Sequence, residues 1–239
     1  MRTLRWSLAR YGMLAAAVTA MVAAVAALAG CRGQLSKATG QASAAAVPLG
    51  ASTHDISVGG VTRSYIVYRP ADLPAAAPLV VMLHGGFGSA QQAERAYGWD
   101  QLADSAKFVV AYPDGVGRAW NVSGCCGRPA QENIDDVGFI TAVVNDISGN
   151  VGVYAKRAYA TGISNGGMMS YTLACNTGTY AAIGPDSATQ LDACESPHPT
   201  SVMHIHGTAD RLIRYGGGPG MGVAHIDGPA VPEDRKSVV

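Results

Sequence analysis

Residues 158–175, AYATGISNGGMMSYTLAC, decide the fold of this chain. The first residues, Ala158 to Thr161, are typical of a β-strand, whereas the run from Met168 to Cys175 is typical of a helix. Between the two lies a G-x-S-x-G pentapeptide with its serine at Ser164. A sharp turn between strand and helix lifts a serine hydroxyl clear of the sheet, over a helix N-terminus whose dipole favours negative charge. The sequence therefore predicts that Ser164 is a nucleophile.

A glycine-rich loop whose serine caps a helix is the alternative interpretation of this pentapeptide. The chain contains 30 glycines, so G-x-S-x-G alone is a weak signal. The flanking strand and helix favour the nucleophile, because Gly162 and Gly166 then fall where strand and helix approach too closely for larger side chains.

Apolar runs alternate with helical segments on both sides of this stretch. Upstream, residues 56–69 alternate apolar and polar side chains around Gly59-Gly60, which indicates a hairpin. Strands alternating with helices predict an α/β fold with a mostly parallel sheet, helices on both faces and functional groups beyond the carboxyl ends of the strands. The expected strands are residues 79–83, 108–112, 157–161, 181–183 and 201–205; the expected helices are 89–106, 135–147 and 165–175, with a polar loop at 116–133.

The loop after the expected strand at 79–83 reads His84-Gly85-Gly86-Phe87-Gly88. An acyl-transfer site needs N–H donors for the negative charge that develops on the substrate oxygen. The backbone N–H of Asn165, directly after the candidate nucleophile, is one candidate donor, and that of Gly86 or Phe87 is the second. An ordinary turn between strand and helix is the alternative for this loop.

The candidate acid is Asp210, which follows the expected strand Val202-Met203-His204-Ile205-His206 through the loop Gly207-Thr208-Ala209. In sites of this kind the acid comes after the nucleophile, at the end of a later strand. Asp186 and Asp192 are competitors, but neither follows so clear a strand.

Two histidines on the strand before Asp210, His204 and His206, point the same way because side chains alternate along a strand. Such a pair can belong to a metal site. No third ligand is nearby in the sequence, so we expect no metal here, and no motif implies a cofactor.

The histidine of such a site should follow the acid. Only His225 does so, fifteen residues after Asp210, and residues 211–224 contain no strand long enough to return the chain to Ser164. Residues 232–239 are charged and show no recognisable last strand or helix. We therefore expect the chain to be truncated at its C-terminus and to lack its catalytic histidine.

The first 30 residues resemble a bacterial lipoprotein signal peptide. Three arginines precede an apolar run at 13–29, and the tetrapeptide ending at Cys31 resembles a lipobox. We expect an exported protein whose lipidated Cys31 anchors it to the cell membrane; a retained transmembrane anchor and cleavage with an incidental cysteine are the alternatives. Residues 31–50 are rich in Ala, Ser and Gly and predict a flexible tether, so that the catalytic domain spans 51–239.

Composition limits the remaining possibilities. The formal net charge is zero, which argues against a nucleic-acid binder, and we expect a monomer. Besides Cys31, four cysteines remain, and an even number in an exported protein favours disulfides over free thiols. Sequence alone does not choose among their three connectivities. These four cysteines are Cys125, Cys126, Cys175 and Cys194.

Six segments carry a resemblance to a known family. In chain order they are PLVVMLHGGFGSAQQAE, VAYPDG, WNVSGCCG, DDVGF, YATGISNGGMMSYTLAC and HIHGTAD. Together they resemble the polyhydroxybutyrate-depolymerase and feruloyl-esterase group of secreted serine esterases, over roughly residues 55–230.

The resemblance implies an α/β-hydrolase fold that hydrolyses carboxylic esters through an acyl-enzyme. It implies that the loop carrying Trp120 and Asn121 lies near the mouth of the active site, where Trp120 binds substrate; a loop anchor packed on the core is the alternative for Trp120. Asp135-Asp136 is interpreted as a helix cap. A surface lipoprotein without catalysis, or an inactive fragment, that serves in binding is the rival interpretation, and the choice among polyester, feruloyl, acetyl and lipid esters stays open.

Overall fold

The computed structural model describes residues 47–123, 125–191, 193–195, 198–221 and 236–238. The expected signal peptide, most of the tether, the lipidated Cys31 and His225 lie outside these residues. Within the described ranges, every helix is too short or too polar to cross a membrane.

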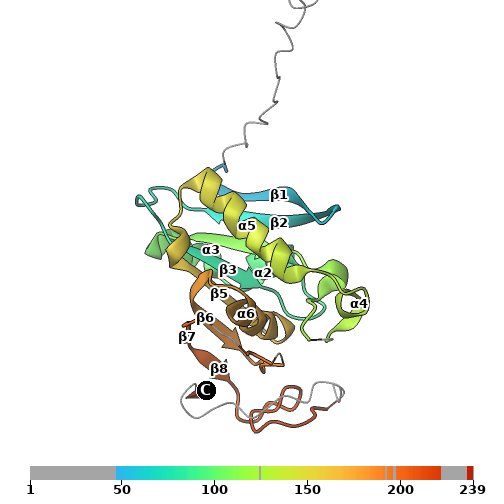
Figure 1. Cartoon of the computed structure of the whole chain (residues 1–239). Helices are drawn as coiled ribbons and strands as arrows, with labels where there is room; N and C mark the ends of the chain where they lie inside the picture. The colour runs from blue at the N-terminus through green and yellow to red at the C-terminus, as the bar shows by residue number, and fades with distance from the viewer. Residues whose placement is uncertain (1–46, 124, 192, 196–197, 222–235, 239) are drawn as a thin grey trace, which may run out of the picture. The chain divides into compact units, whose positions relative to one another are not determined.

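A single mixed sheet organises the described residues (Figure 1). The hairpin of β1 and β2 lies at one edge, and its strands pair antiparallel, as does β2 with β4. The other pairings are parallel, and the strand order is β1-β2-β4-β3-β5-β6-β8-β9, with β7 also paired to β6. The strands are β1 (Gly50–Val58), β2 (Val61–Arg69), β3 (Leu79–Leu83), β4 (Val109–Pro113), β5 (Ala158–Ile163), β6 (Tyr180–Asp186), β7 (Ser201–Val202), β8 (His204–His206) and β9 (Lys236–Val238).

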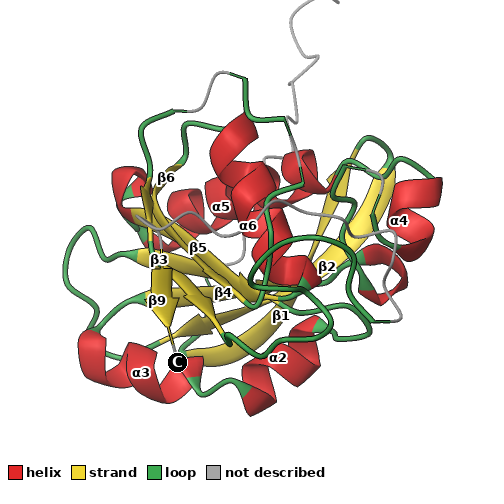
Figure 2. Cartoon of the chain, turned by 90° about the horizontal axis from the view of Figure 1, so that it is seen from below, coloured by secondary structure: helices red, strands yellow, loops and turns green. Residues whose placement is uncertain are grey.

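Helices cover both faces of the sheet, and the predicted fold class is confirmed (Figure 2). The helices α2 and α3 lie on one face, and α5 and α6 on the other. Their bounds are α2 (Ala90–Ala96), α3 (Trp99–Ala106), α4 (Gly127–Gln131), α5 (Asp136–Val151) and α6 (Asn165–Asn176), with 3-10 turns η1 (Val116–Arg118) and η2 (Ala155–Arg157).

The central strand β3 explains why its run is continuously apolar. All five of its residues are buried, and alternate side chains enter two separate cores. Leu79, Val81 and Leu83 pack in the core under α5 and α6, whereas Val80 and Met82 pack in the core under α2 and α3. A parallel strand covered on both faces needs apolar residues at every position.

Two expected elements are subdivided in the structure. The single helix expected at 89–106 is α2 and α3, because Gly98 breaks it in the left-handed region at φ 71°. The loop expected at 116–133 contains η1 and α4. Asp135 caps α5 as expected: its Oδ1 accepts a hydrogen bond from the backbone N–H of Gly138 at 2.7 Å.

The C-terminal edge of the sheet differs from the sequence expectation. The strand expected at 201–205 is the pair β7 and β8, separated by Met203. The expectation of no strand in the last eight residues is wrong, since Lys236–Val238 pairs parallel with His204–His206. A three-residue edge strand is held by backbone pairing, so it leaves no alternation in the sequence by which to recognise it.

The structure also selects a cysteine connectivity. Cys125 pairs with its neighbour Cys126, and Cys175 at the end of α6 pairs with Cys194. The second bridge closes a segment of 19 residues that leaves the end of α6, passes through β6 and reaches the loop after it.

Candidate active site

Ser164 occupies a strained turn between β5 and α6. Its backbone angles are φ 54° and ψ −121°, a conformation that residues with a side chain rarely adopt. Hydrogen bonds on both sides hold it: its N–H donates to the carbonyl of Asp186 at 2.9 Å, and its carbonyl accepts from Met168 at 2.9 Å. Such strain persists where the surroundings over-determine the conformation, which is common at functional sites.

Glycines on either side of Ser164 permit the close approach of β3 to this turn. A Cβ on Gly162 would lie 2.8 Å from the carbonyl oxygen of Leu83, and one on Gly166 would lie 2.5 Å from that of His84. These distances are shorter than real Cβ contacts, so a side chain at either position would push α6 away from the sheet.

The loop of residues 84–88 lies against the nucleophile. A Cβ built on Gly85 would be 3.8 Å from the Cβ of Ser164. The N–H of Phe87 donates to the carbonyl of Arg118 at 2.8 Å, whereas the N–H of Gly86 donates to no other described residue. Asn165 is the first residue of α6, so its N–H has no acceptor within the helix. Asn165 and Gly86 therefore keep backbone donors available beside Ser164, and Phe87 does not.

His84 holds this loop in place through both nitrogens of its ring. Its Nε2 accepts a hydrogen bond from the N–H of Gly115 at 3.0 Å, so its Nδ1 carries the proton and donates to the carbonyl of Gly85 at 2.8 Å. Burial lowers the pKa of His84 and favours this neutral form. Both ring nitrogens are thus used to hold backbone.

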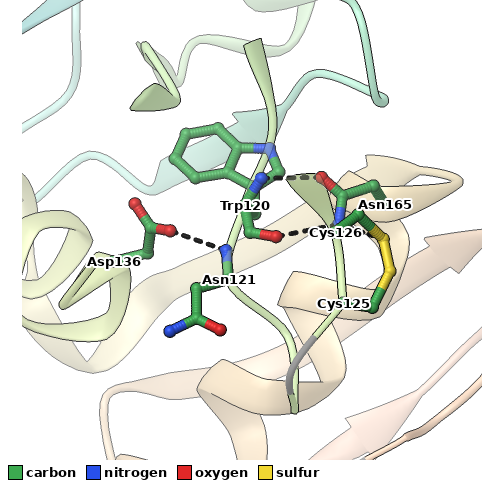
Figure 3. The surroundings of a disulfide bond; sticks show 6 residues. All are labelled: Trp120, Asn121, Cys125, Cys126, Asp136 and Asn165. Carbon is green, nitrogen blue, oxygen red and sulfur yellow. Dashed lines mark hydrogen bonds between the residues drawn. A yellow bond between two sulfur atoms is a disulfide. The ribbon is translucent and has the colours of Figure 1, made fainter. Parts of the chain in front are cut away.

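The side chain of Asn165 binds the backbone of Trp120 at both of its polar groups (Figure 3). Its Oδ1 accepts from the N–H of Trp120 at 2.7 Å, and its Nδ2 donates to the carbonyl of Trp120 at 3.1 Å. The same Nδ2 lies 3.5 Å from the Sγ of Cys126. The residue after the nucleophile therefore attaches the loop of residues 119–126 to the start of α6.

Trp120 is fully buried and offers no surface to a substrate in this structure. Its indole N–H donates to the carbonyl of His84 at 2.8 Å, and its ring lies 4.7 Å from the ring of His84. These contacts fit the loop anchor that the sequence left open as the alternative. Asn121 is only partly buried; its N–H donates to Asp136, and its amide donates to the carbonyl of Ile134 at 3.1 Å.

A buried ion pair that sequence reasoning missed supports this loop. The Arg63 guanidinium lies 2.6 Å from an Asp136 carboxylate oxygen, with both side chains at most 4% exposed. It also stacks on the Phe139 ring at 3.8 Å and donates to the carbonyl of Asp114 at 3.0 Å. Burial raises the pKa of Asp136, and Arg63 and the Asn121 N–H oppose that shift. The sequence held one signal for this ion pair: Arg63 lies two residues before Tyr65 on β2, so both side chains point to the same buried face.

Asp210 lies in the loop that follows β8, with its side chain 17% exposed. Its Oδ1 accepts hydrogen bonds from the N–H groups of Leu212 and Ile213 at 2.8 and 3.0 Å. Its Oδ2 lies 3.4 Å from the Nε2 of His206. The competitor Asp186 binds Ser187 through its carboxylate at 3.0 Å, and Asp192 lies outside the described residues.

In the described part of the chain, no histidine hydrogen-bonds to the Oγ of Ser164. The nitrogens of His206 are engaged by His204 and by the carbonyl of Ile213, so this ring has no free nitrogen for the nucleophile. Within the same residues, no three histidine, cysteine or acidic side chains lie close enough to share a metal ion.

An apolar cavity of about 290 Å³ adjoins the turn at Ile163. It opens beside the carboxyl ends of β5, β6 and β8, where an α/β sheet binds its ligands. Its lining residues are Met82, Tyr97, Trp99, Thr161, Gly162, Ile163, Gly184, Asp186 and Ile205.

Comparison with known proteins agrees with this geometry. Residues 63–212 match the family described as Esterase PHB depolymerase. The chain is 34% identical over 194 residues to a protein of Nocardia uniformis named "Putative esterase NocK", covering 77% of this chain and 54% of that protein. It is 32% identical over 169 residues to feruloyl esterase B of Piromyces equi, covering 65% of this chain and 31% of that protein. The chain thus spans about half of the first relative and less of the second.

Solved structures share the fold at low sequence identity. The acetyl xylan esterase from Aspergillus awamori superposes with a TM-score of 0.56 at 16% identity, covering 68% of this chain and 74% of that one. An S-formylglutathione hydrolase from Staphylococcus aureus superposes with a TM-score of 0.55 at 15% identity, covering 70% of this chain and 82% of that one. With a strained Ser164 at the turn between β5 and α6 and a family match across most of the domain, the chain belongs to the esterase PHB depolymerase family of α/β-hydrolases.

Proposed function

We propose that this chain is a serine esterase that hydrolyses carboxylic esters through an acyl-enzyme. The observation that carries the proposal is the backbone of Ser164, held at φ 54° between β5 and α6. Beside it lie the N–H groups of Asn165 and Gly86, which donate to no other described residue. Family membership supports the same reaction class.

The proposed reaction begins when the Oγ of Ser164 attacks the ester carbonyl carbon and gives its proton to a histidine base. The N–H groups of Asn165 and Gly86 then bind the oxyanion, and Asp210 orients the base. The carbon–oxygen bond breaks, the alcohol leaves with the proton, and water hydrolyses the acyl-enzyme by the same steps. No cofactor takes part.

A fluorophosphonate probe tests the nucleophile. The full-length chain is treated with the probe, and the labelled peptide is identified by mass spectrometry. We expect the label on Ser164 and its loss in Ser164→Ala, with Ser170→Ala as the matched control, since Ser170 lies buried in the same helix. Labelling that survives Ser164→Ala contradicts the proposal.

The base requires its own experiment. The prediction that this chain lacks its catalytic histidine stays a prediction, because His225 lies outside the described residues. Loss of a triad base typically costs several orders of magnitude in rate, so turnover of p-nitrophenyl acetate by the chain and its histidine variants measures which histidine is the base. Robust turnover that His225→Ala abolishes would instead identify His225 as the base.

The substrate class is proposed as a polyhydroxyalkanoate-type polyester or a feruloyl or acetyl ester of a polysaccharide. The apolar cavity beside Ile163, with Tyr97 and Trp99 in its wall, suits an acyl chain or an aromatic acid. Product analysis on four esters separates the classes: a hydroxybutyrate oligomer, methyl ferulate, acetylated xylan and a triglyceride. Release from the triglyceride alone would contradict this proposal.

A non-catalytic binding role is the second candidate, because no described histidine contacts Ser164. Binding of acetylated xylan or a polyester film by the Ser164→Ala chain, without probe labelling of the parent chain, would favour it.

Anchoring at Cys31 is proposed from the sequence preceding it. Mass spectrometry of the mature N-terminus should find a diacylglyceryl-modified Cys31 in the expressed full-length protein, and Cys31→Ala should prevent acylation. An unmodified Cys31, or cleavage elsewhere, contradicts the proposal.

A further inference from the structure

A buried chain of hydrogen bonds joins α6 to the loop that carries Asp210. The hydroxyl of Tyr171 lies 2.8 Å from the Nδ1 of His204. The Nε2 of His204 lies 2.9 Å from the Nδ1 of His206, and the Nε2 of His206 lies 2.7 Å from the carbonyl oxygen of Ile213. All three side chains are at least 95% buried.

With both rings neutral, these hydrogen bonds can run in one direction only. A carbonyl oxygen only accepts, so the Nε2 of His206 must carry a proton and donate to Ile213. A neutral imidazole has one N–H, which leaves the Nδ1 of His206 to accept from the Nε2–H of His204. The Nδ1 of His204 then accepts from the hydroxyl of Tyr171. Burial lowers the pKa of His204 to about 4, which agrees with a neutral ring at pH 7.

The end of this chain lies against the candidate acid. The His206 Nε2–H that binds the Ile213 carbonyl also lies 3.4 Å from the Oδ2 of Asp210. The N–H of Ile213 in turn donates to the Oδ1 of Asp210. The ring of His206 thus contacts both ends of the turn from Asp210 to Ile213. At its other end, the series of hydrogen bonds includes the hydroxyl of Tyr171, which belongs to α6, the helix that starts beside Ser164.

We propose that Tyr171, His204 and His206 are positioning residues, whose one-way hydrogen-bond chain fixes the orientation of the Asp210 carboxylate relative to the nucleophile helix. The inference rests on the proposed role of Asp210 in ester hydrolysis. The charged and titratable groups around the two rings are Asp186 on β6, Asp210 and the ring of Tyr215, which lies 5.7 Å from that of His206.

Nitrogen-15 NMR of the full-length protein shows which ring nitrogen of each histidine carries the proton, and so gives the direction of the hydrogen bonds without any activity assay. At pH 7 we expect both His204 and His206 as neutral rings protonated at Nε2. The assignment uses His204→Gln and His206→Gln, each of which removes one ring's signals. A His206 ring protonated at Nδ1, or charged at pH 7, would overturn the proposal, whether or not the chain hydrolyses esters.

Tyr171→Phe tests whether these hydrogen bonds position the Asp210 loop, since it removes only the hydroxyl that bonds to His204. We expect the ring signals of both histidines to shift. We also expect amide exchange of Leu212 and Ile213 to quicken on the order of fivefold, because a hydrogen bond contributes about 1 kcal/mol. Exchange in β3 and β5 should stay as in the parent chain, which separates a local effect from global unfolding.

His54→Gln is the matched control, because the His54 side chain lies in the hairpin of β1 and β2, where it hydrogen-bonds to Ser52 at 2.8 Å and stacks on Tyr65. It should change neither the ring signals of His204 and His206 nor the exchange of the Asp210 loop. Unchanged exchange at Leu212 and Ile213 in Tyr171→Phe would overturn the positioning role. Failure of the fluorophosphonate test would remove the proposed function while leaving these readings interpretable.

Discussion

The side-chain amide of Asn165 pairs with both backbone groups of Trp120, although 45 residues separate the two in sequence. The amide thereby acts like one residue of a neighbouring strand. It ties the loop that carries Trp120 to the turn that carries Ser164.

Asn165→Ala should destabilise the protein by roughly 1–3 kcal/mol, because it leaves the buried N–H of Trp120 without its acceptor. The carbonyl of Trp120 loses one of its two donors and keeps the N–H of Cys126 at 3.3 Å. The substitution keeps the backbone N–H proposed to bind the oxyanion. Urea denaturation of the full-length chain measures the change. Asn176→Ala is the control, since Asn176 bonds only to Thr172 within α6 in the described contacts, and its loss should cost less than 1 kcal/mol. Equal effects of the two variants would contradict this role of Asn165.

The ion pair of Arg63 and Asp136 predicts a non-additive double substitution. Arg63→Met alone should cost about 3–5 kcal/mol, since it leaves a buried carboxylate unpaired. Asp136→Leu alone should cost a similar amount, and the double variant should recover most of the loss. Urea denaturation of the four chains completes the cycle. Additive losses would mean that the two side chains act independently.

Gly166→Ala should destabilise the protein by at least 1–3 kcal/mol, because its Cβ would collide with the carbonyl of His84. It should also abolish probe labelling, since α6 and Ser164 must shift together. Gly149→Ala in α5 is the matched control, because its Cβ meets nothing within 4 Å. That variant should gain about 0.5–1 kcal/mol from helix propensity. Thermal melting compares the two, and a tolerated alanine at position 166 would refute the packing argument.

The pKa of His204 predicts how stability depends on pH. Its folded value of about 4 lies below the unfolded value of 6.5, so the unfolded chain binds more protons between these values. Stability should therefore be fully present above pH 6.5 and decline as the pH falls toward 4, by on the order of 3 kcal/mol. The lowered pKa of His84 acts in the same direction.

Urea midpoints at pH 7, 5.5 and 4.5 test this dependence. His204→Gln should be less stable at pH 7 but should show a flatter decline across the same range. An equally steep decline in this variant would assign the effect to other groups.

Local sequence patterns were enough to predict the strand, turn and helix around the nucleophile. The G-x-S-x-G pentapeptide and its flanks identified the strand, the turn and the helix that the structure contains as β5, Ser164 and α6. Continuous apolar runs also predicted β3 and β4, because a strand buried on both faces must be apolar throughout. The fold class followed from the alternation of these elements.

Contacts between distant segments were decided only by the tertiary structure. Nothing local indicates that Asn165 binds Trp120, that Arg63 pairs with Asp136 or that Tyr171 reaches His204. The donor choice between Gly86 and Phe87 likewise depends on Arg118, whose carbonyl takes the Phe87 N–H. Periodicity reports which face of an element is buried, whereas the partner on that face depends on how the whole chain packs.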